Sequence, residues 1–435
     1  MNAPQTPAPK LRPEQRPFVC AHAGHPDWRM AVELVLAQVE AQTLAQGRKS
    51  AGNTGFLYIT DALAEHASDI LTTLKFRTGI SSWAGCTGIA TYGQGAEYMD
   101  EPAVCVMVGS FASSGVRVFS GRDVLPKKAA RIISYDDDSE VRRDADGALT
   151  NDRCLVHADP STPLLADVLS ELSSQMNLGD VFGGLVSSRA SHAQFADTTF
   201  MAGVSGMVFA SHIDVRTRIT QGCYPIHPQQ RGWRVLEHEG AWISAVSNEA
   251  RGRSAFRALL QDLSLVAEEG EMHEVDPEAL KAKLEGGVFV SITPPQAKAT
   301  KTLGLPGETN HVIRGLAGID PLRGSIAVGG DIKPGSTLRF CKRNAQAAKA
   351  DLVRVCTELR EEFEEQGIKP RGAVVISCLS RGQRLFGSNG AELAIIQKAL
   401  GFSAAQPLPL VGFAANGEVA GGKLHGFSAV IAVFA

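Results

Sequence analysis

The feature that most constrains the fold is a unit of helix, Gly-bounded loop and strand, which recurs along the chain in plainer forms. In its fullest form it reads SCLSRGQRLFGSNGAELAIIQKALGF from Ser377, followed by PLVGFAANGEVAGGKLHGFSAVIAVF, which ends at Phe434. Plainer versions are GISSWAGCTGIATYG with AVCVMVGSF, and LGDVFGGLVSS with MAGVSGMVFAS. Recurrence of this kind predicts a fold built from related halves. We expect the small-residue loops to line one place, where a ligand would bind.

Hydrophobic periodicity predicts an α/β layered arrangement in the first half of the chain. Strands are expected at FVCAHAG and GFLYIT, with a helix from about 28 to 46 between them that Asp27 caps and Gly47 ends. A later helix is expected to open at Pro163 with Thr162 as its cap. The segment 102–121 is expected to be a pair of strands joined at 113–115.

The second half continues the alternation of strands and helices. RVLEHEGAWISAVS predicts a hairpin that turns at Glu239–Gly240, and helices are expected at about 256–266 and 345–366. AVVISCLS is expected to be a buried strand. The predicted fold is therefore α/β, with two related sheet-and-helix domains packed together and mixed sheets with helices on their faces. We expect a disordered Pro-rich tail at 1–16 and domains at 17–225 and 226–435.

Composition narrows the class of protein. A net charge of −3 over 435 residues gives no field that would attract nucleic acid or an anionic membrane. No segment approaches the roughly 18 apolar residues that a membrane span needs, and the N-terminus lacks the apolar stretch of a signal peptide. The eight cysteines are scattered singly without a CxxC pair, so we expect them to be reduced. A cytoplasmic location is expected.

Several tracts resemble one family in their order and separation. LSRGQRLFGS, PLVGFAANGE and the closing strand resemble the C-terminal domain of the FIST family. GCTGIATYG, FGGLVSS and QGCYPI resemble its N-terminal domain, so that 17–225 and 226–435 correspond to FIST N-terminal-like and C-terminal-like domains. The resemblance implies a non-catalytic, small-ligand-binding sensory protein of signal transduction. An amino acid or a similar metabolite is the implied ligand.

The resemblance also bears on partners and cofactors. No kinase, cyclase, chemotaxis or F-box segment accompanies the FIST-like region, so we expect a separate signalling partner protein. No cofactor or metal is expected, because no histidine or cysteine set has the spacing of a metal site. Two alternatives stay open. Some members that resemble this family bind haem and sense nitric oxide, and the loops could instead be purely structural parts of a protein-interaction scaffold.

The predicted ligand-binding residues lie in the recurring loops. Glycines there let a ligand approach main-chain N–H groups closely, although they also permit tight turns without any ligand. An amino-acid ligand needs a cation for its carboxylate and an acceptor for its amine. The candidates are Cys86, Thr87, Gly88, Ser187, Arg381, Arg384, Asn416 and Glu418.

Each charged candidate has an alternative role. Arg381 and Arg384 could pair with Glu392 or Glu418 and only fix the loop, and a cap at Ser388 or Asn389 is expected for the helix that follows. No base can be assigned to Cys86, so an inert thiol is favoured over a nucleophile. No acid–base pair is legible elsewhere, and an enzyme is not expected.

Overall fold

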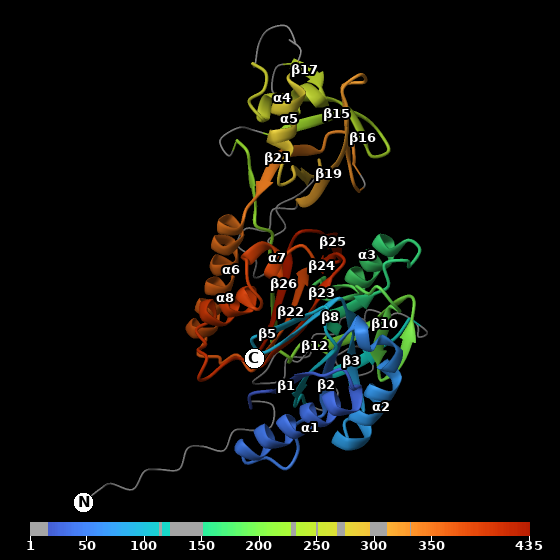
Figure 1. Cartoon of the computed structure of the whole chain (residues 1–435), viewed down its shortest axis with the longest axis vertical. Coiled ribbons are helices and arrows are strands. Elements are labelled where there is room, and N and C mark those ends of the chain that lie inside the picture. The colour runs from blue at the N-terminus through green and yellow to red at the C-terminus, as the bar shows by residue number, and fades with distance from the viewer. Residues whose placement is uncertain are drawn as a thin grey trace, which may run out of the picture. The chain divides into compact units, whose positions relative to one another are not determined.

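The computed structural model describes residues 16–112, 115–121, 151–227, 232–248, 251–267, 275–295, 311–330 and 332–435. Contacts divide the chain into two compact units (Figure 1). Unit 1 comprises the chain up to Ile219, Cys356–Leu424 and Ala429–Ala435, and unit 2 comprises Thr220–Val355 and His425–Ser428. Unit 2 is thus inserted into the sequence of unit 1. The boundary near 225 stays a prediction, and the tail predicted at 1–16 lies, apart from Arg16, outside the described residues.

The same strand order occurs three times in unit 1, and we call the three segments that show it copies 1, 2 and 3. Copy 1 comprises β1 (Val19–Gly24), α1 (Trp28–Ala45), β2 (Thr54–Thr60), the 3-10 helix η2 (Asp61–His66), α2 (Ala67–Thr78), β3 (Ser82–Gly88), β4 (Ala90–Gly93), β5 (Ala96–Met99) and β6 (Ala103–Gly109). Copy 2 comprises β7 (Val116–Phe119), β8 (Asn151–Ala158), α3 (Leu165–Gln175), β9 (Asp180–Leu185), β10 (Ala193–Ala196), β11 (Thr198–Met201) and β12 (Val204–Ala210). Copy 3 begins with β13 (Val215–Thr220) and continues with α6 (Ala345–Glu365), whose first half the contacts assign to unit 2. The rest of copy 3 comprises β22 (Gly372–Cys378), α7 (Gly382–Phe386), α8 (Ala391–Ala399), β23 (Leu410–Ala415), β24 (Glu418–Ala420), β25 (Lys423–His425) and β26 (Ala429–Phe434).

Each copy builds a mixed sheet of the same design. Sheet 1 has the order β1-β6-β2-β3-β10-β11, sheet 2 the order β7-β12-β8-β9-β24-β25 and sheet 3 the order β13-β26-β22-β23-β4-β5. In every sheet the two strands joined through a helix are parallel, and the copy's last strand is antiparallel to the first of them. The mixed sheets with helices confirm the predicted α/β class.

The copies exchange hairpins in a closed cycle. The hairpin β10–β11 of copy 2 extends sheet 1, β24–β25 of copy 3 extends sheet 2, and β4–β5 of copy 1 extends sheet 3. Each sheet therefore holds four strands of its own copy and two of the next. The exchange covers an edge strand in each sheet that would otherwise present unpaired backbone groups.

One glycine in each copy explains why the sequence unit recurs. Gly85, Gly183 and Gly412 lie opposite equivalent residues of the neighbouring parallel strand. A Cβ at these positions would lie 1.7, 1.9 and 1.7 Å from the carbonyl oxygen of that partner. No side chain fits in such a gap, so only glycine allows the two strands to pair this closely.

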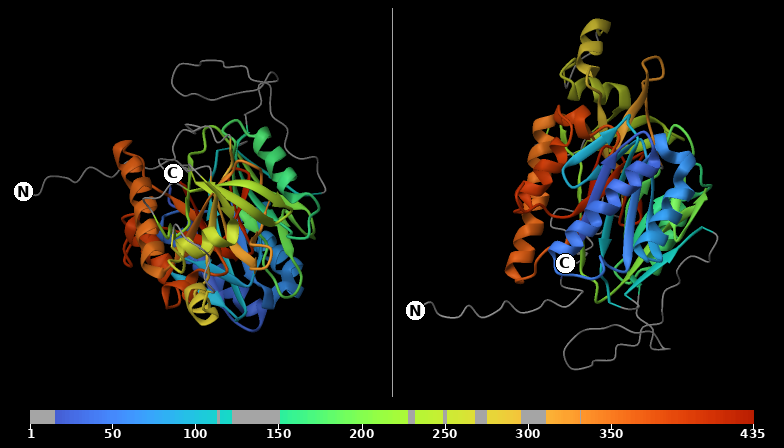
Figure 2. Two further views of the ribbon diagram at one scale, coloured as in Figure 1. Left: turned by 90° about the horizontal axis from the view of Figure 1, so that it is seen from above. Right: turned by 60° about the horizontal axis from the view of Figure 1, so that its bottom comes forward.

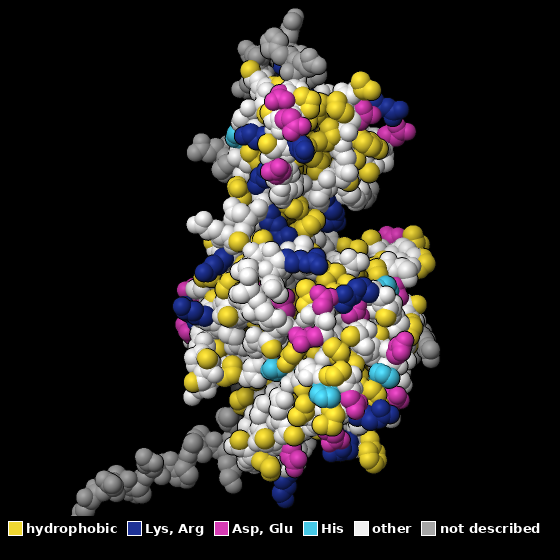
Figure 3. All heavy atoms as spheres, in the orientation of Figure 1, with side chains coloured by type: hydrophobic (Ala, Val, Ile, Leu, Met, Phe, Trp, Pro, Cys, Tyr) yellow, Lys and Arg dark blue, Asp and Glu magenta, His cyan; other side chains and the backbone are white. Residues whose placement is uncertain are grey.

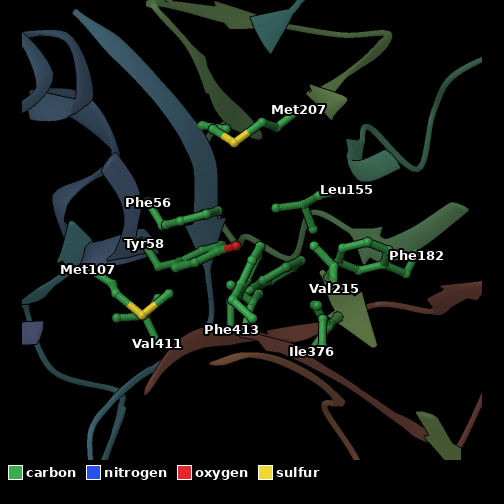
Figure 4. Close-up of a cluster of buried hydrophobic side chains, with 14 of the residues drawn as sticks. Phe56, Tyr58, Met107, Leu155, Phe182, Met207, Val215, Ile376, Val411 and Phe413 are labelled. Atoms are coloured by element: carbon green, nitrogen blue, oxygen red, sulfur yellow. The ribbon is translucent and has the colours of Figure 1, made fainter. Parts of the chain in front are cut away.

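The inner faces of the three sheets enclose one apolar core (Figure 4). Equivalent pairs from neighbouring strands contribute to it: Phe56 with Met107 in sheet 1, Leu155 with Met207 in sheet 2, and Val374 with Ala432 in sheet 3. Burial of this much apolar surface is the main stabilising contribution to unit 1.

Helices cover the outer faces of the sheets (Figure 2). Asp27 caps α1 as predicted, because its carboxylate accepts a hydrogen bond from the Arg29 N–H at 2.9 Å. Gln38 and Gln42 of α1 exchange side-chain hydrogen bonds with the backbone of His22 and Cys20 in β1, at distances from 2.6 to 3.3 Å. These side-chain amides thus satisfy backbone N–H and carbonyl groups of β1, which is an edge strand of sheet 1.

Two local predictions for unit 1 were wrong. The helix predicted at Pro163 begins instead at Leu165, preceded by Leu164 in the left-handed region, and the Thr162 hydroxyl donates to the Gly203 carbonyl rather than capping the helix. The segment 102–121 does contain β6 and β7, but these belong to sheets 1 and 2 and do not pair with each other.

Unit 2 is built on one antiparallel sheet. Its order is β14 (Cys223–Pro225), β21 (Thr337–Arg343), β15 (Trp233–Glu239), β16 (Trp242–Asn248), β20 (Ser325–Val328), β19 (Val312–Asp320) and β18 (Phe289–Thr293), and β18 also pairs with β21. The other elements are β17 (Arg251–Ser254), α4 (Ala255–Asp262) and α5 (Pro277–Leu284). The predicted hairpin at 239–240 is confirmed, whereas α4 ends earlier than the predicted helix.

Candidate functional site

Three crossovers carry the chain from one sheet to the next at the carboxyl ends of β3, β9 and β23. We call them the crossover ring: residues 88–89, 186–192 and 416–417. The Ser187 hydroxyl accepts a hydrogen bond from the Ile89 N–H at 3.0 Å and donates to the Ala414 carbonyl. Leu185 exchanges backbone hydrogen bonds with the third crossover, at 2.8 Å with Gly417 and 3.0 Å with Asn416. The small-residue loops of the sequence thus meet in one place, inside unit 1.

The candidates of β3 are sealed within this ring. Cys86 is fully buried in the central core, and this burial raises the pKa of its thiol well above the ordinary value. The Thr87 hydroxyl lies 3.3 Å from two backbone carbonyls, those of Ser191 and Ala193. A Cβ at Gly88 would lie 2.6 Å from the Ala90 carbonyl oxygen. In this structure these three residues therefore contact other parts of the protein interior.

The candidates of the third crossover differ in exposure. Asn416 is exposed, whereas Glu418 is completely buried in β24, opposite Gly184. Arg384 on α7 is exposed as well. Among the eight candidates, Asn416 and Arg384 are therefore the side chains that solvent reaches most freely.

Arg381 is the most deeply buried cation among the candidates, with 1% of its surface exposed. Its Nε and Nη2 both lie 2.7 Å from Glu392 Oε1, and the guanidinium lies over the Phe386 ring. Of the two pairings considered for it, the structure contains the one with Glu392. Its Nη1 atom is buried and has no hydrogen-bond partner among the described residues.

A buried polar cluster surrounds this ion pair between sheet 3 and its helices. The other Glu392 oxygen accepts hydrogen bonds from the Ser377 hydroxyl at 2.7 Å and from the Gly382 N–H at 3.2 Å. Glu97, from the hairpin that copy 1 contributes, accepts from the Gly390 N–H at 3.0 Å. We call Tyr92, Glu97, Ser377, Arg381 and Glu392 the sheet 3 cluster.

Burial makes ionisation costly throughout this cluster. It raises the pKa of Glu97, and the nearby charge of Glu392 adds to the shift, while hydrogen bonds from the backbone oppose it. The pKa of Tyr92 is raised by burial and by both carboxylates. The Arg381 guanidinium is thus paired with Glu392, while burial opposes the ionised form of Glu97.

The cluster adjoins the crossover ring. The Leu379 N–H donates to the Ala415 carbonyl at 3.1 Å, so the turn that leads to Arg381 lies beside the start of the third crossover. Gly382, Gly387 and Gly390 all have positive φ, at 53°, 87° and 68°, and they bound α7 and the turn after it. The structure therefore joins the predicted loops to a polar site beneath a short helix.

Sequence reasoning missed parts of this site. Glu97 was not a candidate, although it follows the small-residue loop GCTGIATYG by only a few positions. The helix α7 was not predicted, and the cap expected at Ser388 or Asn389 is wrong, because Gly390 occupies the N-cap position of α8 without a side-chain cap. Asn389 instead donates from its side chain to the Glu97 carbonyl at 2.5 Å.

Other kinds of site have little support in the described part of the chain. It contains no group of three or more His, Cys, Asp or Glu side chains that could hold a metal ion. His157, deep in the core, donates to or accepts from the Tyr58 hydroxyl at 3.1 Å, and burial lowers its pKa to about 3. On the face shown in Figure 3, Lys and Arg are scattered among apolar and acidic side chains.

A membrane span is likewise not found among the helices that the structure describes. None of them combines the length and the apolar character that a bilayer crossing requires. All eight cysteines are free thiols, as expected from their spacing.

Comparison with known proteins identifies relatives of nearly the same length. The family model for the FIST N domain matches residues 53–247, and that for the FIST C domain matches 288–421. An uncharacterized protein of Mycobacterium tuberculosis is 29% identical over 412 residues, which cover 91% of this chain and 95% of the relative. An uncharacterized protein of Mycobacterium bovis is 29% identical over 382 residues, or 86% of this chain and 88% of the relative.

Proposed function

The chain belongs to the FIST family, and on that basis we propose that it is a cytoplasmic, non-catalytic sensor that binds an amino acid or a similar small metabolite. FIST domains are sensory, small-ligand-binding domains of signalling proteins. The proposed site in this chain is the sheet 3 cluster together with the exposed side chains of Arg384 and Asn416 beside it. A separate partner protein would receive the signal.

The observation that carries this proposal is the buried Nη1 of Arg381. A buried guanidinium nitrogen without an acceptor is costly, and such groups are rare in native structures. A ligand carboxylate would supply the missing acceptor and would form a strong charge-assisted hydrogen bond there. Arg384 offers a second cation on the same short segment.

The ammonium of an amino acid would find its partner in the same cluster. Glu97 has a raised pKa because its carboxylate is buried and lies near Glu392. A positive group next to Glu97 would favour its ionised form and relieve that cost. The cluster thus offers both kinds of partner that an amino acid requires.

Access to Arg381 requires movement of α7. This helix of five residues is bounded by glycines with positive φ, which are conformationally permissive positions. We place the opening at this helix, since its Phe386 ring packs against the buried guanidinium and its Arg384 is exposed. Ligand binding would then change the position of α7, which a partner protein could read.

A thermal-shift screen of the full chain against amino acids and small carboxylated metabolites tests the proposal. A compound that binds the native state raises the melting temperature in proportion to the logarithm of its excess over Kd. Arg384→Ala is expected to weaken the hit roughly tenfold, which corresponds to loss of one charge-assisted hydrogen bond.

The matched control is Lys398→Ala, which removes another exposed cation of the same copy from α8. It is expected to leave the affinity of the hit unchanged. The proposal fails if no compound stabilises the protein, or if Arg384→Ala and Lys398→Ala have the same effect.

A further inference from the structure

A polar pocket lies at the opposite end of sheet 1 from the crossover ring, where β2 begins and β6 ends. Its volume is about 310 Å³, and its lining consists of Arg16, Arg48, Lys49, Ser50, Gly52, Asn53, Ser110 and Phe111. We propose that this pocket binds a small-molecule anion that carries two or more negative charges. The site is distinct from the sheet 3 cluster and does not depend on the function proposed for it.

The charge of the lining is the first argument. Arg16, Arg48 and Lys49 are cationic, and none of the eight lining residues is acidic. Like charges that share a small space repel one another, so the native state holds them together at a cost. An anion in the pocket would turn that repulsion into attraction.

The environment of Arg48 is the second argument. Its side chain is 6% exposed, yet within the described residues it donates only to neutral oxygens. These are the Gln46 amide oxygen at 3.0 Å, the Ser110 hydroxyl at 2.9 Å, and the carbonyls of Pro17 and Ala51. Buried charges in proteins are usually paired with an opposite charge, and the part of the chain that the structure describes gives Arg48 no such counterion.

The direction of the pKa shift of Arg48 agrees with a buried guanidinium that lacks a counterion in the described part of the chain. Burial lowers that pKa, and the positive charge of Arg16 lowers it further. Both effects oppose the charged form of a side chain that stays charged in proteins. A bound anion would counter both of them.

The walls of the pocket are held in place by hydrogen bonds. Arg371 donates to the Ser110 carbonyl at 2.6 Å and to the Arg16 carbonyl at 2.9 Å. The Asn53 amide pairs with the backbone of Phe111, at 2.8 Å to its carbonyl and 3.0 Å from its N–H. Two strands and the loop after α1 thus fix the lining before any ligand arrives, which reduces the entropic cost of binding.

Lys49 is the group best placed to contact the ligand directly. It is exposed, and its ammonium makes no hydrogen bond or ion pair with the described residues. The volume of the pocket lies at the lower end of the range for small-molecule sites. It suits a small organic phosphate or a polycarboxylate, and both offer the charged oxygen acceptors that these cations select.

Titration calorimetry of the full chain tests this site with inorganic phosphate and citrate as probes, at constant ionic strength set by chloride. At least one probe is expected to bind, and the probe that binds more tightly distinguishes a phosphate site from a polycarboxylate site. Lys49→Ala is expected to weaken binding roughly tenfold, and Lys49→Arg to retain it. Added salt is expected to weaken binding in the native protein.

Lys398→Ala is the control for a general loss of positive charge, and Arg384→Ala is the control for the other site. Both are expected to leave phosphate and citrate binding unchanged. The proposal is overturned if neither probe binds above the chloride background, or if Lys49→Ala binds as tightly as Lys398→Ala. Because Lys49 is exposed, its replacement is expected to leave the protein folded, which a circular dichroism spectrum checks.

Discussion

At the residue scale, Gly85, Gly183 and Gly412 are positions of unit 1 that leave no room for a side chain. Each lies where the neighbouring carbonyl oxygen occupies the space of a Cβ, at 1.7 to 1.9 Å. In Gly85 and Gly183 the backbone also has a positive φ, of 154° and 148°. The requirement for glycine at these positions is steric, and it does not depend on any ligand.

Replacement of any one of these glycines by alanine is therefore expected to destabilise unit 1 severely. The strands must separate to admit the methyl group, and we expect a loss of at least about 3 kcal/mol in the free energy of unfolding. Urea unfolding followed by circular dichroism measures it. Gly95→Ala is the matched control, since a Cβ there would meet nothing within 4 Å. Equal stability of the Gly85 and Gly95 variants would contradict the prediction.

Asp262 in unit 2 gives a prediction for pH. Burial raises its pKa to about 6, and the hydrogen bonds from Trp233 Nε1, at 3.2 Å to each oxygen, oppose the shift only in part. Since the folded pKa exceeds the unfolded one, the folded state keeps the proton longer as pH rises. Stability is expected to fall between about pH 4 and pH 6, by about 3 kcal/mol in total.

Asp262→Asn tests the pH prediction, because the amide oxygen can still accept from Trp233 but cannot ionise. The variant is expected to lose this contribution to the pH dependence of unfolding. Melting temperatures of unit 2 across pH 3.5 to 7 make the comparison. A slope in the variant as steep as in the native protein would assign the effect to other groups.

The sequence could predict single residues only where the requirement is local. Asp27 was predicted as a cap because its partner, the Arg29 N–H, is two residues away. The partner of Arg381 was predicted only as one of two alternatives, Glu392 or Glu418. Glu97 could not be placed at all, because it reaches Gly390 through a hairpin contributed by another copy, across almost 300 positions of the chain.

At the scale of elements, the crossover ring depends on Ser187. Its hydroxyl accepts from the Ile89 N–H and donates to the Ala414 carbonyl, so it links residues of all three copies. Ser187→Ala would leave a partly buried N–H and a buried carbonyl without this partner. We expect a loss of about 1–3 kcal/mol in the free energy of unfolding.

Ser81→Ala is the control for Ser187, because Ser81 is exposed and the described residues give its hydroxyl no hydrogen bond. It is expected to change stability by less than about 0.5 kcal/mol. Hydrogen exchange at the Ile89 amide adds a local measurement. Unchanged protection there in Ser187→Ala would contradict the role assigned to the hydroxyl.

Elements with a strong periodic pattern were predicted well, and short ones were not. The helix predicted at 345–366 is α6, which the structure places at Ala345–Glu365. In contrast, α7 has only five residues and no room for a periodic pattern. Strand partners were harder still, since β6 and β7 are neighbours in sequence but belong to different sheets. Register and partner depend on distant segments that local patterns do not encode.

At the scale of the whole molecule, unit 2 is an insertion whose two ends meet. The Thr220 hydroxyl and the Gln221 N–H both donate to Asp351, at 2.7 and 3.0 Å, and Cys223 lies directly opposite Arg343 in the β14–β21 pair. Replacement of residues 224–342 by Asn-Gly would therefore close the chain with a two-residue hairpin turn. Unit 1 is expected to fold in this shortened chain.

Circular dichroism and calorimetry check the shortened chain, which is expected to melt in one cooperative transition. Phosphate and citrate binding gives an independent measurement, since all residues of the polar pocket lie in unit 1. A control deletion of equal length cannot be tolerated within unit 1, where every copy supplies a hairpin to another sheet. Failure of the shortened chain to fold would show that unit 1 requires unit 2.

The recurrence in the sequence predicted related halves, whereas the strand pairings show three copies within unit 1. The β-hairpins of the copies differ in sequence, and the inserted unit 2 separates β13 from the rest of copy 3. The repeated strand order becomes visible only once the pairings are known. The family itself could be recognised from the sequence alone, because its Gly-rich tracts occur in the same order along the chain.

The exchange of hairpins has a consequence for how such a molecule could arise. A polypeptide of one copy's length would leave one sheet edge open and carry a hairpin with no sheet of its own to join. Three identical polypeptides of that kind would complete one another head to tail, and the ring would close at three. The present chain has the geometry that such a trimer would have after fusion of its three subunits. The inserted unit, the α7 segment and the basic pocket each belong to only one of them.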